Sequence, residues 1–247
     1  MPLRSVSLAA PAYNEAAGIA RVVRSWDAFL SAYTGLDRYE IIVCNDGSKD
    51  DTGTILDELA KEIANLKPVH FATNQGAAAA LTNAIAHTTS EWVLLIDSDG
   101  QFPIDNLSRL EAAVAGGGPA AIGVRQAKRD SLTARFGTWS SGAVCNLIYG
   151  SKLSDFNSAL KLVRGDLLRS LTLEAKGLNY STEVTAKILE CGVSLNETAI
   201  THEKRATGVS SMKLIRGSIH RLLFVFYLAV RRALLAASVL QSRKYEA

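Results

Sequence analysis

Two carboxylates stand close together in the segment WVLLIDSDGQF, residues 92–102. Asp97 and Asp99 directly follow an apolar run of the kind that forms a buried strand, and Gly100 beside them permits a turn. If both side chains turn toward one point, their like charges repel unless a cation lies between them. Mg²⁺ and Mn²⁺ favour carboxylate and phosphate oxygens and take few protein ligands. The pair therefore predicts one divalent cation whose coordination is completed by a substrate diphosphate.

Two simpler interpretations compete with this one. An EF-hand calcium loop does not fit, because the glycine stands at the fourth position and Ser108 occupies the place of the bidentate Glu. An aspartate that merely caps a helix stays open, because a D-x-D pair alone occurs in many solvated loops. The neighbouring segments must decide between a cap and a metal site.

Two other polar loops follow apolar runs in the first part of the chain. They are PAYNE at 11–15 and NDGSKDDT at 45–52. In the second loop Gly47 permits a tight turn, and Ser48, Asp50 or Asp51 could cap the following helix. A capped turn and nothing more is one interpretation. The other is that both loops line one pocket, because they follow neighbouring strands.

The elements that carry these loops alternate regularly. Apolar runs at 5–10, 39–44, 68–72 and 91–96 are separated by amphipathic stretches of helical length at about 15–33, 51–65 and 76–88. This pattern predicts a three-layer α/β fold with a mostly parallel sheet, whose strands end at the rim where such sheets bind ligands. Further elements are expected as strands near 119–124, 158–164 and 193–200 and helices near 130–149 and 180–191.

Composition and length restrict the class of protein. With 247 residues, 48% hydrophobic and 21% charged, the chain can bury one substantial α/β core with at most an appendage, and it is neither disordered nor fibrous. The three cysteines are widely spaced, which excludes a C-x-x-C zinc or redox site and favours a reducing compartment. No apolar leader opens the chain, so we expect a cytoplasmic location.

The basic charge is concentrated at the end of the chain. Residues 201–247 contain nine Lys or Arg and two acidic residues, although the net charge of the whole chain is only +3. Only nine uncharged residues, 222–230, precede Arg231 and Arg232, whereas a spanning helix needs about 20 apolar residues. We expect residues 214–247 to form amphipathic helices that lie on an anionic membrane surface, with Arg221, Arg232 and Arg243 on one side. The alternative is that their apolar face packs on the body or on another subunit.

Four motifs in this order, PAYNE, NDGSKDDT, NQG at 74–76 and DSDGQFP at 97–103, resemble the family-two glycosyltransferases of the GT-A fold. The nearest branch is that of the dolichyl-phosphate mannose synthase-like and polyprenyl-phosphate glycosyltransferases. Segments 155–168, 183–200 and 205–213 also resemble that branch, so the resemblance covers about residues 5–213. It implies a Rossmann-like catalytic domain at 1–213, followed by the basic tail at 214–247.

The resemblance also implies roles for individual residues. The residues that it places beside the donor nucleotide are Pro11, Tyr13, Glu15 and Asp46. Those that it assigns to Mg²⁺ or Mn²⁺ on the donor diphosphate are Asp97, Asp99 and Gln101. Candidate phosphate binders are Arg125, Arg129, Arg135, Arg205 and Lys213, and the residues expected to act in catalysis are Asp99, Asp155 and Arg205. One departure is Asn45, where the family commonly has aspartate, so the contact expected there carries no charge.

We therefore expect a metal-dependent, inverting glycosyltransferase that moves one sugar from a nucleotide-diphosphate sugar to a polyprenyl, dolichyl-type phosphate at the cytoplasmic membrane surface. A lipid phosphate is already an anion, so no strong general base is required. A soluble transferase that modifies a glycan or protein hydroxyl would need a base, for which Asp155 is the candidate. A non-catalytic nucleotide-sugar-binding protein is the third interpretation. A sugar nucleotidyltransferase is disfavoured, because PAYNEAAG lacks a glycine-rich basic loop. We expect no nucleic-acid partner, and a homo-oligomer stays open.

Overall fold

The structure, a computed structural model, describes residues 3–125, 132–175, 179–203, 214–237, 240 and 244–245, without the side chains of 132–139 and 214–222. Its sheet has seven strands in the order β3-β2-β1-β4-β6-β5-β7. The strands are β1 (Ser5–Ala12), β2 (Arg38–Asn45), β3 (Leu66–His70), β4 (Trp92–Leu95), β5 (Ala120–Arg125), β6 (Lys161–Arg164) and β7 (Asn196–Ile200). The helices are α1 (Ile19–Ser31), α2 (Thr52–Glu62), α3 (Ala77–Ala86), α4 (Asn106–Val114), α5 (Leu132–Tyr149), α6 (Gly165–Ser170), α7 (Tyr180–Glu190) and α8 (Leu214–Ala236).

The sheet is mostly parallel, as predicted, with one antiparallel strand. β1 pairs in parallel with β2 and β4, β2 with β3, and β5 with β7. β6 instead runs antiparallel between β4 and β5, so that Lys161 lies beside Leu95 on one side and Ile122 on the other. This reversed strand brings the start of β6 to the edge of the sheet where its parallel neighbours end.

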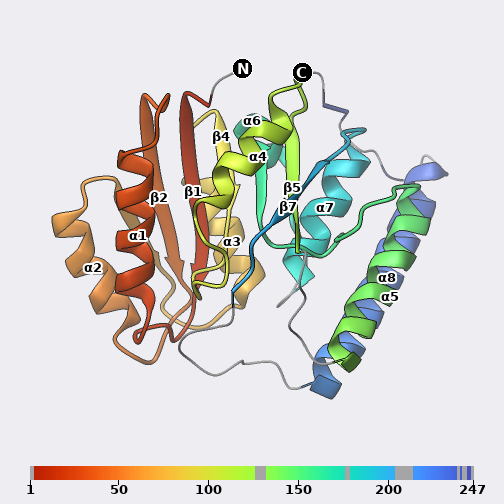
Figure 1. Cartoon of the computed structure of the whole chain (residues 1–247). Coiled ribbons are helices and arrows are strands. Elements are labelled where there is room, and N and C mark those ends of the chain that lie inside the picture. Colours follow the sequence, from red (N-terminus) through yellow and green to blue (C-terminus); the bar gives the residue numbers. More distant parts are fainter. Residues whose placement is uncertain are drawn as a thin grey trace.

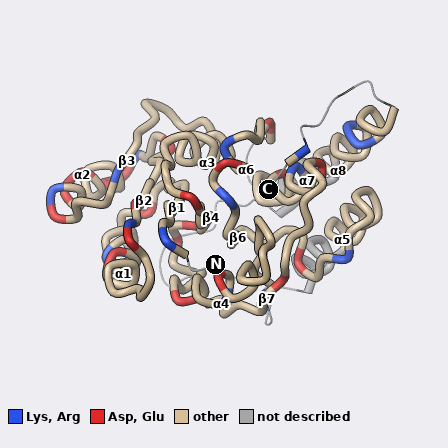
Figure 2. The backbone as a smooth tube through the Cα atoms, turned by 90° about the horizontal axis from the view of Figure 1, so that it is seen from above, with Lys and Arg blue, Asp and Glu red and all other residues tan. Residues whose placement is uncertain are grey.

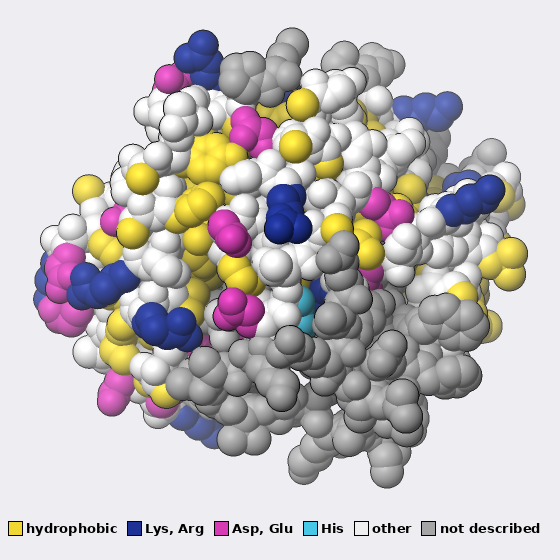
Figure 3. All heavy atoms as spheres, in the orientation of Figure 1, with side chains coloured by type: hydrophobic (Ala, Val, Ile, Leu, Met, Phe, Trp, Pro, Cys, Tyr) yellow, Lys and Arg dark blue, Asp and Glu magenta, His cyan; other side chains and the backbone are white. Residues whose placement is uncertain are grey.

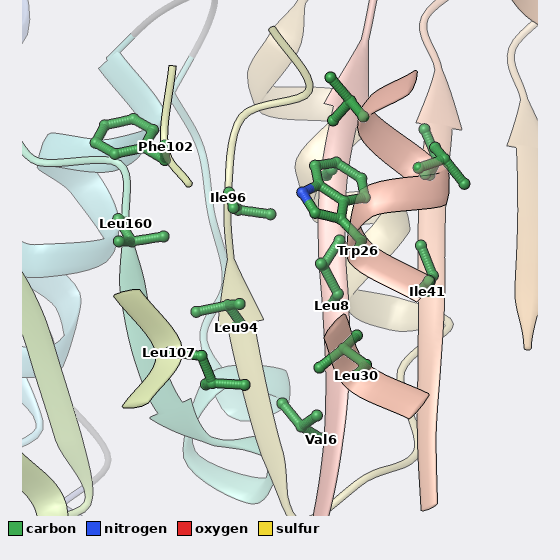
Figure 4. Packing of buried hydrophobic residues seen from close by; sticks show 14 of the residues in the cluster. Val6, Leu8, Trp26, Leu30, Ile41, Leu94, Ile96, Phe102, Leu107 and Leu160 are labelled. Atoms are coloured by element: carbon green, nitrogen blue, oxygen red, sulfur yellow. The ribbon is translucent and has the colours of Figure 1, made fainter. Parts of the chain in front are cut away.

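Helices cover both faces of the sheet, which confirms the predicted three layers (Figures 1 and 2). α1 and α4 lie on one face, and α3, α6 and α7 lie on the other. Trp26 of α1 is fully buried over Leu8 and beside Ile41, while Leu107 of α4 faces Leu94 (Figure 4). Because side chains alternate along each strand, the two faces of the sheet build two separate apolar clusters.

The structure differs from the sequence expectation in the end of β1 and in two additional helices. β1 extends beyond the predicted run at 5–10 and ends at Ala12. The pairing of β1 with β4 ends at Ala9, so the missing N–H of Pro11 removes no hydrogen bond from the sheet. The helices α4 and α6 were not anticipated. For α4, the buried positions Leu107, Leu110 and Val114 are three and four residues apart and carried the helical signal.

A buried carboxylate stabilises the edge of the sheet where the parallel strands begin. Glu40 of β2 accepts hydrogen bonds from Ser7 Oγ at 2.5 Å, from the Thr89 N–H at 2.5 Å and from Lys67 Nζ at 2.7 Å. Burial alone would raise its pKa, but these donors outweigh burial and lower the pKa of Glu40 to about 2. The ionised carboxylate thus connects β1, β2, β3 and the turn before β4.

We expect Glu40→Gln to lower the free energy of unfolding at pH 7 by about 2 to 3 kcal/mol, because the charged acceptor is lost. Since the folded pKa is depressed, this contribution is present above the ordinary pKa of a glutamate and disappears as the pH falls toward about 2. Chemical denaturation at pH 7 and at acidic pH measures both. Glu62→Gln, which removes an exposed partner of Arg24, is the control and should change stability by less than about 0.5 kcal/mol. Equal stability of the two variants would contradict the assignment.

Candidate functional site

The loops after β1 and β2 are hydrogen-bonded directly to each other. The Asn14 N–H donates to Ser48 Oγ at 3.0 Å, and Asn14 Oδ1 accepts the Lys49 N–H at 2.9 Å. The Glu15 N–H donates to Thr52 Oγ1 at 2.8 Å. Asn14 has a positive φ of 54°, which turns its side chain and its N–H toward the second loop. The sequence prediction that PAYNE and NDGSKDDT lie together is confirmed.

Asp46 holds the NQG motif against the end of β2. Its carboxylate accepts hydrogen bonds from Asn74 Nδ2 at 2.8 Å, from the Gln75 N–H at 2.7 Å and from the Gly76 N–H at 2.9 Å. The approach is close, because a Cβ on Gly47, whose φ is +61°, would lie 2.4 Å from the Thr73 carbonyl carbon. Asp46 therefore shapes the loop that follows β3, whatever further contact it makes with a ligand.

Asn45, where the family commonly has aspartate, uses both its amide oxygen and its amide nitrogen in contacts with neighbouring residues. Its Oδ1 accepts the Ser48 N–H at 3.1 Å, and its Nδ2 lies 3.1 Å from His70 Nδ1. His70 Nε2 in turn lies 3.0 Å from a carboxylate oxygen of Asp57. With the amide donating to Nδ1, the His70 proton belongs on Nε2, toward Asp57. An aspartate at position 45 would need a second proton on His70 to keep this bond.

The three predicted metal ligands, Asp97, Asp99 and Gln101, lie in the segment after β4, which contacts the end of β1. Ser98 Oγ donates to the Pro11 carbonyl oxygen at 2.7 Å, which fixes the loop against β1. Gly100 turns the chain with a φ of +74°, and Asp99 Oδ1 accepts the Gln101 N–H at 3.0 Å. Gln101 also bonds through its backbone oxygen to the Glu203 N–H at 2.8 Å. The loop after β4 is therefore connected to the segment that follows β7.

Asp97 is in an environment that favours a cation. Burial and the nearby charge of Asp99 raise its pKa to about 6, although Tyr180, Arg125 and Lys161 act in the opposite direction. A hard divalent cation fits this oxygen donor set, because it would neutralise the charge that these carboxylates share. Within the described residues no group of three or more His, Cys, Asp or Glu could hold a metal.

Arg125 and Asp155, predicted separately as a phosphate binder and a catalytic residue, form a bidentate ion pair. Arg125 Nε donates to Asp155 Oδ2 at 2.7 Å, and its terminal NH2 donates to Oδ1 at 3.0 Å. Asp155 is buried and Arg125 is largely buried. Planar pairing of this kind fixes the orientation of the guanidinium group. Before Asp155 could accept a proton as a general base, this pair would have to open.

Two residues near Asp97 were not found from the sequence. The hydroxyl of Tyr180, the first residue of α7, donates to Asp97 Oδ1. Lys161, the first residue of β6, is completely buried. Burial lowers the pKa of Lys161 to about 7, although Asp155 and Asp97 act to raise it. No local motif marks either residue, because only the reversed path of β6 and the packing of α7 bring them to this edge.

Several predicted residues lie where the structure gives no account of them. Arg205, Lys213, Arg129 and Arg243 fall outside the described residues. Arg135 and Arg221 lie in the parts of α5 and α8 whose side chains are not described. Within the loop after β1, Tyr13 is half-buried and Glu15 is buried.

The helices α5 and α8 lie side by side at one end of the molecule, away from β2 and β3 (Figures 1 and 2). Val225 and Leu228 of α8 are buried in a small cluster with Cys145 and Phe156. One apolar face of the tail therefore packs on the body, which agrees with the alternative to the membrane interpretation. Arg231 faces the same way and donates from Nε to Glu190 at 3.1 Å.

A second apolar face of α8 points outward. Its exposed hydrophobic residues are Leu223, Phe226, Val230 and Leu234, hereafter the outer stripe, and α5 adds exposed Val144 and Leu147. At 100° per residue the outer stripe covers an arc of about 80°, with Arg232 on the opposite side of the helix. Figure 3 shows hydrophobic side chains at the edge where Figure 1 places α5 and α8. Neither these helices nor any other described helix combines the length and apolarity that a transmembrane span requires.

Comparison with known proteins agrees with the sequence motifs. The family model described as glycosyl transferase family 2 matches residues 7–169. The undecaprenyl-phosphate 4-deoxy-4-formamido-L-arabinose transferase of Klebsiella pneumoniae is 28% identical over 172 residues, 69% of this chain and 52% of that protein. The dolichyl-phosphate beta-glucosyltransferase of Trichomonas vaginalis is 33% identical over 112 residues, 44% of this chain and 35% of that protein. The chain thus spans about half the length, or less, of these relatives.

Solved structures share the architecture at low identity. Glucosyl-3-phosphoglycerate synthase from Mycobacterium tuberculosis, in complex with Mn²⁺ and uridine-diphosphate-glucose, superposes with a TM-score of 0.69 at 21% identity, over 93% of this chain and 79% of that one. Mannosyl-3-phosphoglycerate synthase from Rubrobacter xylanophilus gives a TM-score of 0.68 at 15% identity, over 98% of this chain and 77% of that one. These likenesses confirm the predicted GT-A fold.

We expect Asp97→Asn to stabilise the metal-free protein. The raised pKa means that the folded state loses stability as the pH rises from the ordinary value of an aspartate through about 6, and a neutral amide removes this penalty. In EDTA at pH 7.5 the free energy of unfolding of the variant should exceed that of the wild type by about 1 to 2 kcal/mol, which corresponds to a Tm higher by roughly 2 to 8 °C. This difference should disappear near pH 4. Asp105→Asn, which changes an exposed carboxylate, should leave Tm unchanged. A lower Tm for Asp97→Asn at pH 7.5 would show that the ionised Asp97 carboxylate does not destabilise the folded protein.

Proposed function

The chain belongs to glycosyl transferase family 2, and we propose that it transfers one sugar, with inversion, from a nucleotide-diphosphate sugar to a polyprenyl phosphate. The observation that carries the proposal is the Asp97 and Asp99 pair after β4, in a segment that is hydrogen-bonded to Pro11 at the carboxyl edge of the sheet. This edge is where open α/β sheets bind ligands. A carboxylate pair there suits the diphosphate of a donor through Mg²⁺ or Mn²⁺.

In this proposal the donor nucleotide lies against the two connected loops. The residues that border it are Pro11, Tyr13, Glu15 and Asp46. Asp97, Asp99 and Gln101 would hold the divalent cation, which when bound supplies charge stabilisation to the diphosphate. The M. tuberculosis relative in the fold comparison holds Mn²⁺ and uridine-diphosphate-glucose, which supports this kind of donor and cation. Arg205 and Lys213, in the segment after β7, are proposed to grip phosphate groups.

The transfer itself needs no enzyme nucleophile. An oxygen of the acceptor phosphate forms a bond to the anomeric carbon while the bond from that carbon to the diphosphate oxygen breaks, and the electron pair leaves with the nucleoside diphosphate. Because the acceptor phosphate is already ionised, no proton has to be removed. Arg125, fixed by Asp155 and close enough to Asp97 to influence its pKa, provides positive charge where the phosphates would meet.

The Arg125–Asp155 pair also separates the proposed acceptor from its main alternative. A glycan or protein hydroxyl would need a general base, and Asp155 binds Arg125 through both of its oxygens. A phosphate acceptor needs a fixed guanidinium instead. The curated relatives carry the names of undecaprenyl-phosphate and dolichyl-phosphate transferases, which supports a polyprenyl phosphate.

We further propose that residues 1–213 form the catalytic domain and that the tail at 214–247 rests on the cytoplasmic face of a membrane. The support is the outer stripe of α8, because an apolar stripe on a helix whose opposite face already packs on the body suits the headgroup boundary of a bilayer. Arg231 contributes little to such binding, since it is paired with Glu190. Apolar contact should therefore outweigh charge.

The proposed transfer is tested with a panel of labelled nucleotide sugars, a polyprenyl phosphate and Mg²⁺ or Mn²⁺, followed by extraction into organic solvent. We expect label in the organic phase with one donor, a loss on the order of 10²- to 10³-fold for Asp97→Asn and Asp99→Asn, and no transfer in excess EDTA. Asp105→Asn is the control, since this exposed residue precedes α4 and makes no capping bond through its side chain. Full activity in EDTA would rule out the metal site, and label only on a water-soluble acceptor would favour the alternative.

Membrane contact is tested by sedimentation with vesicles. We expect Phe226→Ser combined with Val230→Ser to weaken binding at least tenfold, because two exposed apolar side chains are lost. Arg232→Gln should have a smaller effect, and anionic vesicles should bind only moderately better than zwitterionic ones. If the double variant binds like the wild type, the outer stripe does not face lipid; a loss of self-association instead would assign it to a second copy.

A further inference from the structure

The orientation of the Asp97 carboxylate is set from outside its own loop. The hydroxyl of Tyr180, the first residue of α7, donates to Asp97 Oδ1. Tyr180 is itself buried, with its ring in the apolar cluster on the α3, α6 and α7 face of the sheet. A carboxylate that accepts one hydrogen bond on Oδ1 still presents Oδ2 to a cation. Tyr180 therefore determines which oxygen faces the site.

Lys161 holds the part of the chain that carries Tyr180. Its Nζ donates to the carbonyl oxygen of Ser158 and, at 3.0 Å, to that of Ser181. Ser181 is the second residue of α7, directly after Tyr180, and Thr185 Oγ1 also reaches back to the Phe156 carbonyl oxygen at 3.0 Å. A buried ammonium group is expensive unless its hydrogen bonds are used. Here they join the segment before β6 to the first turn of α7.

The rest of α7 is fixed as well. Lys187 Nζ contacts Glu174 at 2.7 Å, and the Glu183 carboxylate accepts the N–H groups of Glu174 and Ala175, each at 2.7 Å. Glu190, the last residue of α7, pairs with Arg231 of α8 at 3.1 Å. These contacts fix the later turns of α7, whereas Lys161 fixes the first turn, which carries the Tyr180 hydroxyl. With that turn held in place, the Asp97 carboxylate adopts the position that the hydroxyl sets.

We propose that Tyr180 and Lys161 are positioning residues for Asp97, with Lys161 fixing the first turn of α7 and Tyr180 holding Oδ1 so that Oδ2 faces the divalent cation. This inference rests on the proposed function, since it takes Asp97 as a metal ligand. Groups that hydrogen-bond to metal ligands commonly contribute 10- to 100-fold to metal affinity. Neither residue touches the sugar, the diphosphate or the cation in this account.

The test measures Mn²⁺ affinity by electron paramagnetic resonance of free Mn²⁺, without turnover, in the presence of a nucleoside diphosphate. We expect Tyr180→Phe to weaken Mn²⁺ binding about 10- to 100-fold with an unchanged fold, because only one hydroxyl is removed. Tyr227→Phe is the matched control: its hydroxyl donates to the Glu174 carboxylate at 2.6 Å, away from Asp97, and Mn²⁺ affinity should not change.

Lys161→Met provides the second variant, with Lys187→Met as its control, because both lysines are buried and only Lys161 supports the Tyr180 turn. We expect the first to weaken Mn²⁺ binding about tenfold, and the second to lower Tm without altering Mn²⁺ affinity. Unchanged or tighter Mn²⁺ binding by Tyr180→Phe, while Asp97→Asn has lost it, would overturn the positioning role alone. Absence of Mn²⁺ binding in the wild type would instead overturn the proposed metal site.

Discussion

The negative charge that Asp97 and Asp99 bring to the end of a buried strand is the constraint on which the rest of this site depends. Burial and mutual repulsion raise the pKa of Asp97 to about 6, and Tyr180, Arg125 and Lys161 each reduce that penalty without removing it. Carboxylates whose charge remains unfavourable in the folded protein are typical of functional sites, where a bound ligand neutralises that charge. A divalent cation with a diphosphate would do so here, which joins the stability of the site to its chemistry.

The acidic residues at the two edges of the sheet have different roles, in stability at one edge and in the proposed chemistry at the other. At the edge where the parallel strands begin, Glu40 is fully satisfied by donors from three segments, and its pKa is depressed. At the opposite edge the Asp46 carboxylate is hydrogen-bonded to the loop after β3, and the pKa of Asp97 is raised. The helix α7 connects this site to the tail, because its first residue, Tyr180, binds Asp97 and its last, Glu190, pairs with Arg231 of α8. The site, α7 and the outer helices therefore form one continuous set of contacts.

Much of this arrangement could be predicted from local sequence. Alternating runs identified β1 to β4 and the helices between them, and the ends of the runs placed Asp46, Asp97 and Asp99 at the carboxyl edge of the sheet. Lys161 and Tyr180 could not be predicted, because their roles arise from contacts between segments far apart in the chain: Lys161 reaches Asp97 only through the antiparallel return of β6. The sequence interpretation also gave α8 a single apolar face, whereas the helix has one that packs on Cys145 and Phe156 and another that is exposed. A hydrophobic pattern alone cannot say which neighbour each face meets.

The central claim is that the carboxylates of this edge and a donor diphosphate share one divalent cation. The most direct measurement is a titration of the wild-type protein with Mn²⁺, with and without nucleoside diphosphates of different bases. The account predicts one Mn²⁺ per chain, bound more tightly when the preferred nucleoside diphosphate is present, and by reciprocity a nucleoside diphosphate bound more tightly by the same factor when Mn²⁺ is present. Binding of Mn²⁺ that is independent of every nucleoside diphosphate, or a nucleotide affinity that Mn²⁺ leaves unchanged, would contradict it.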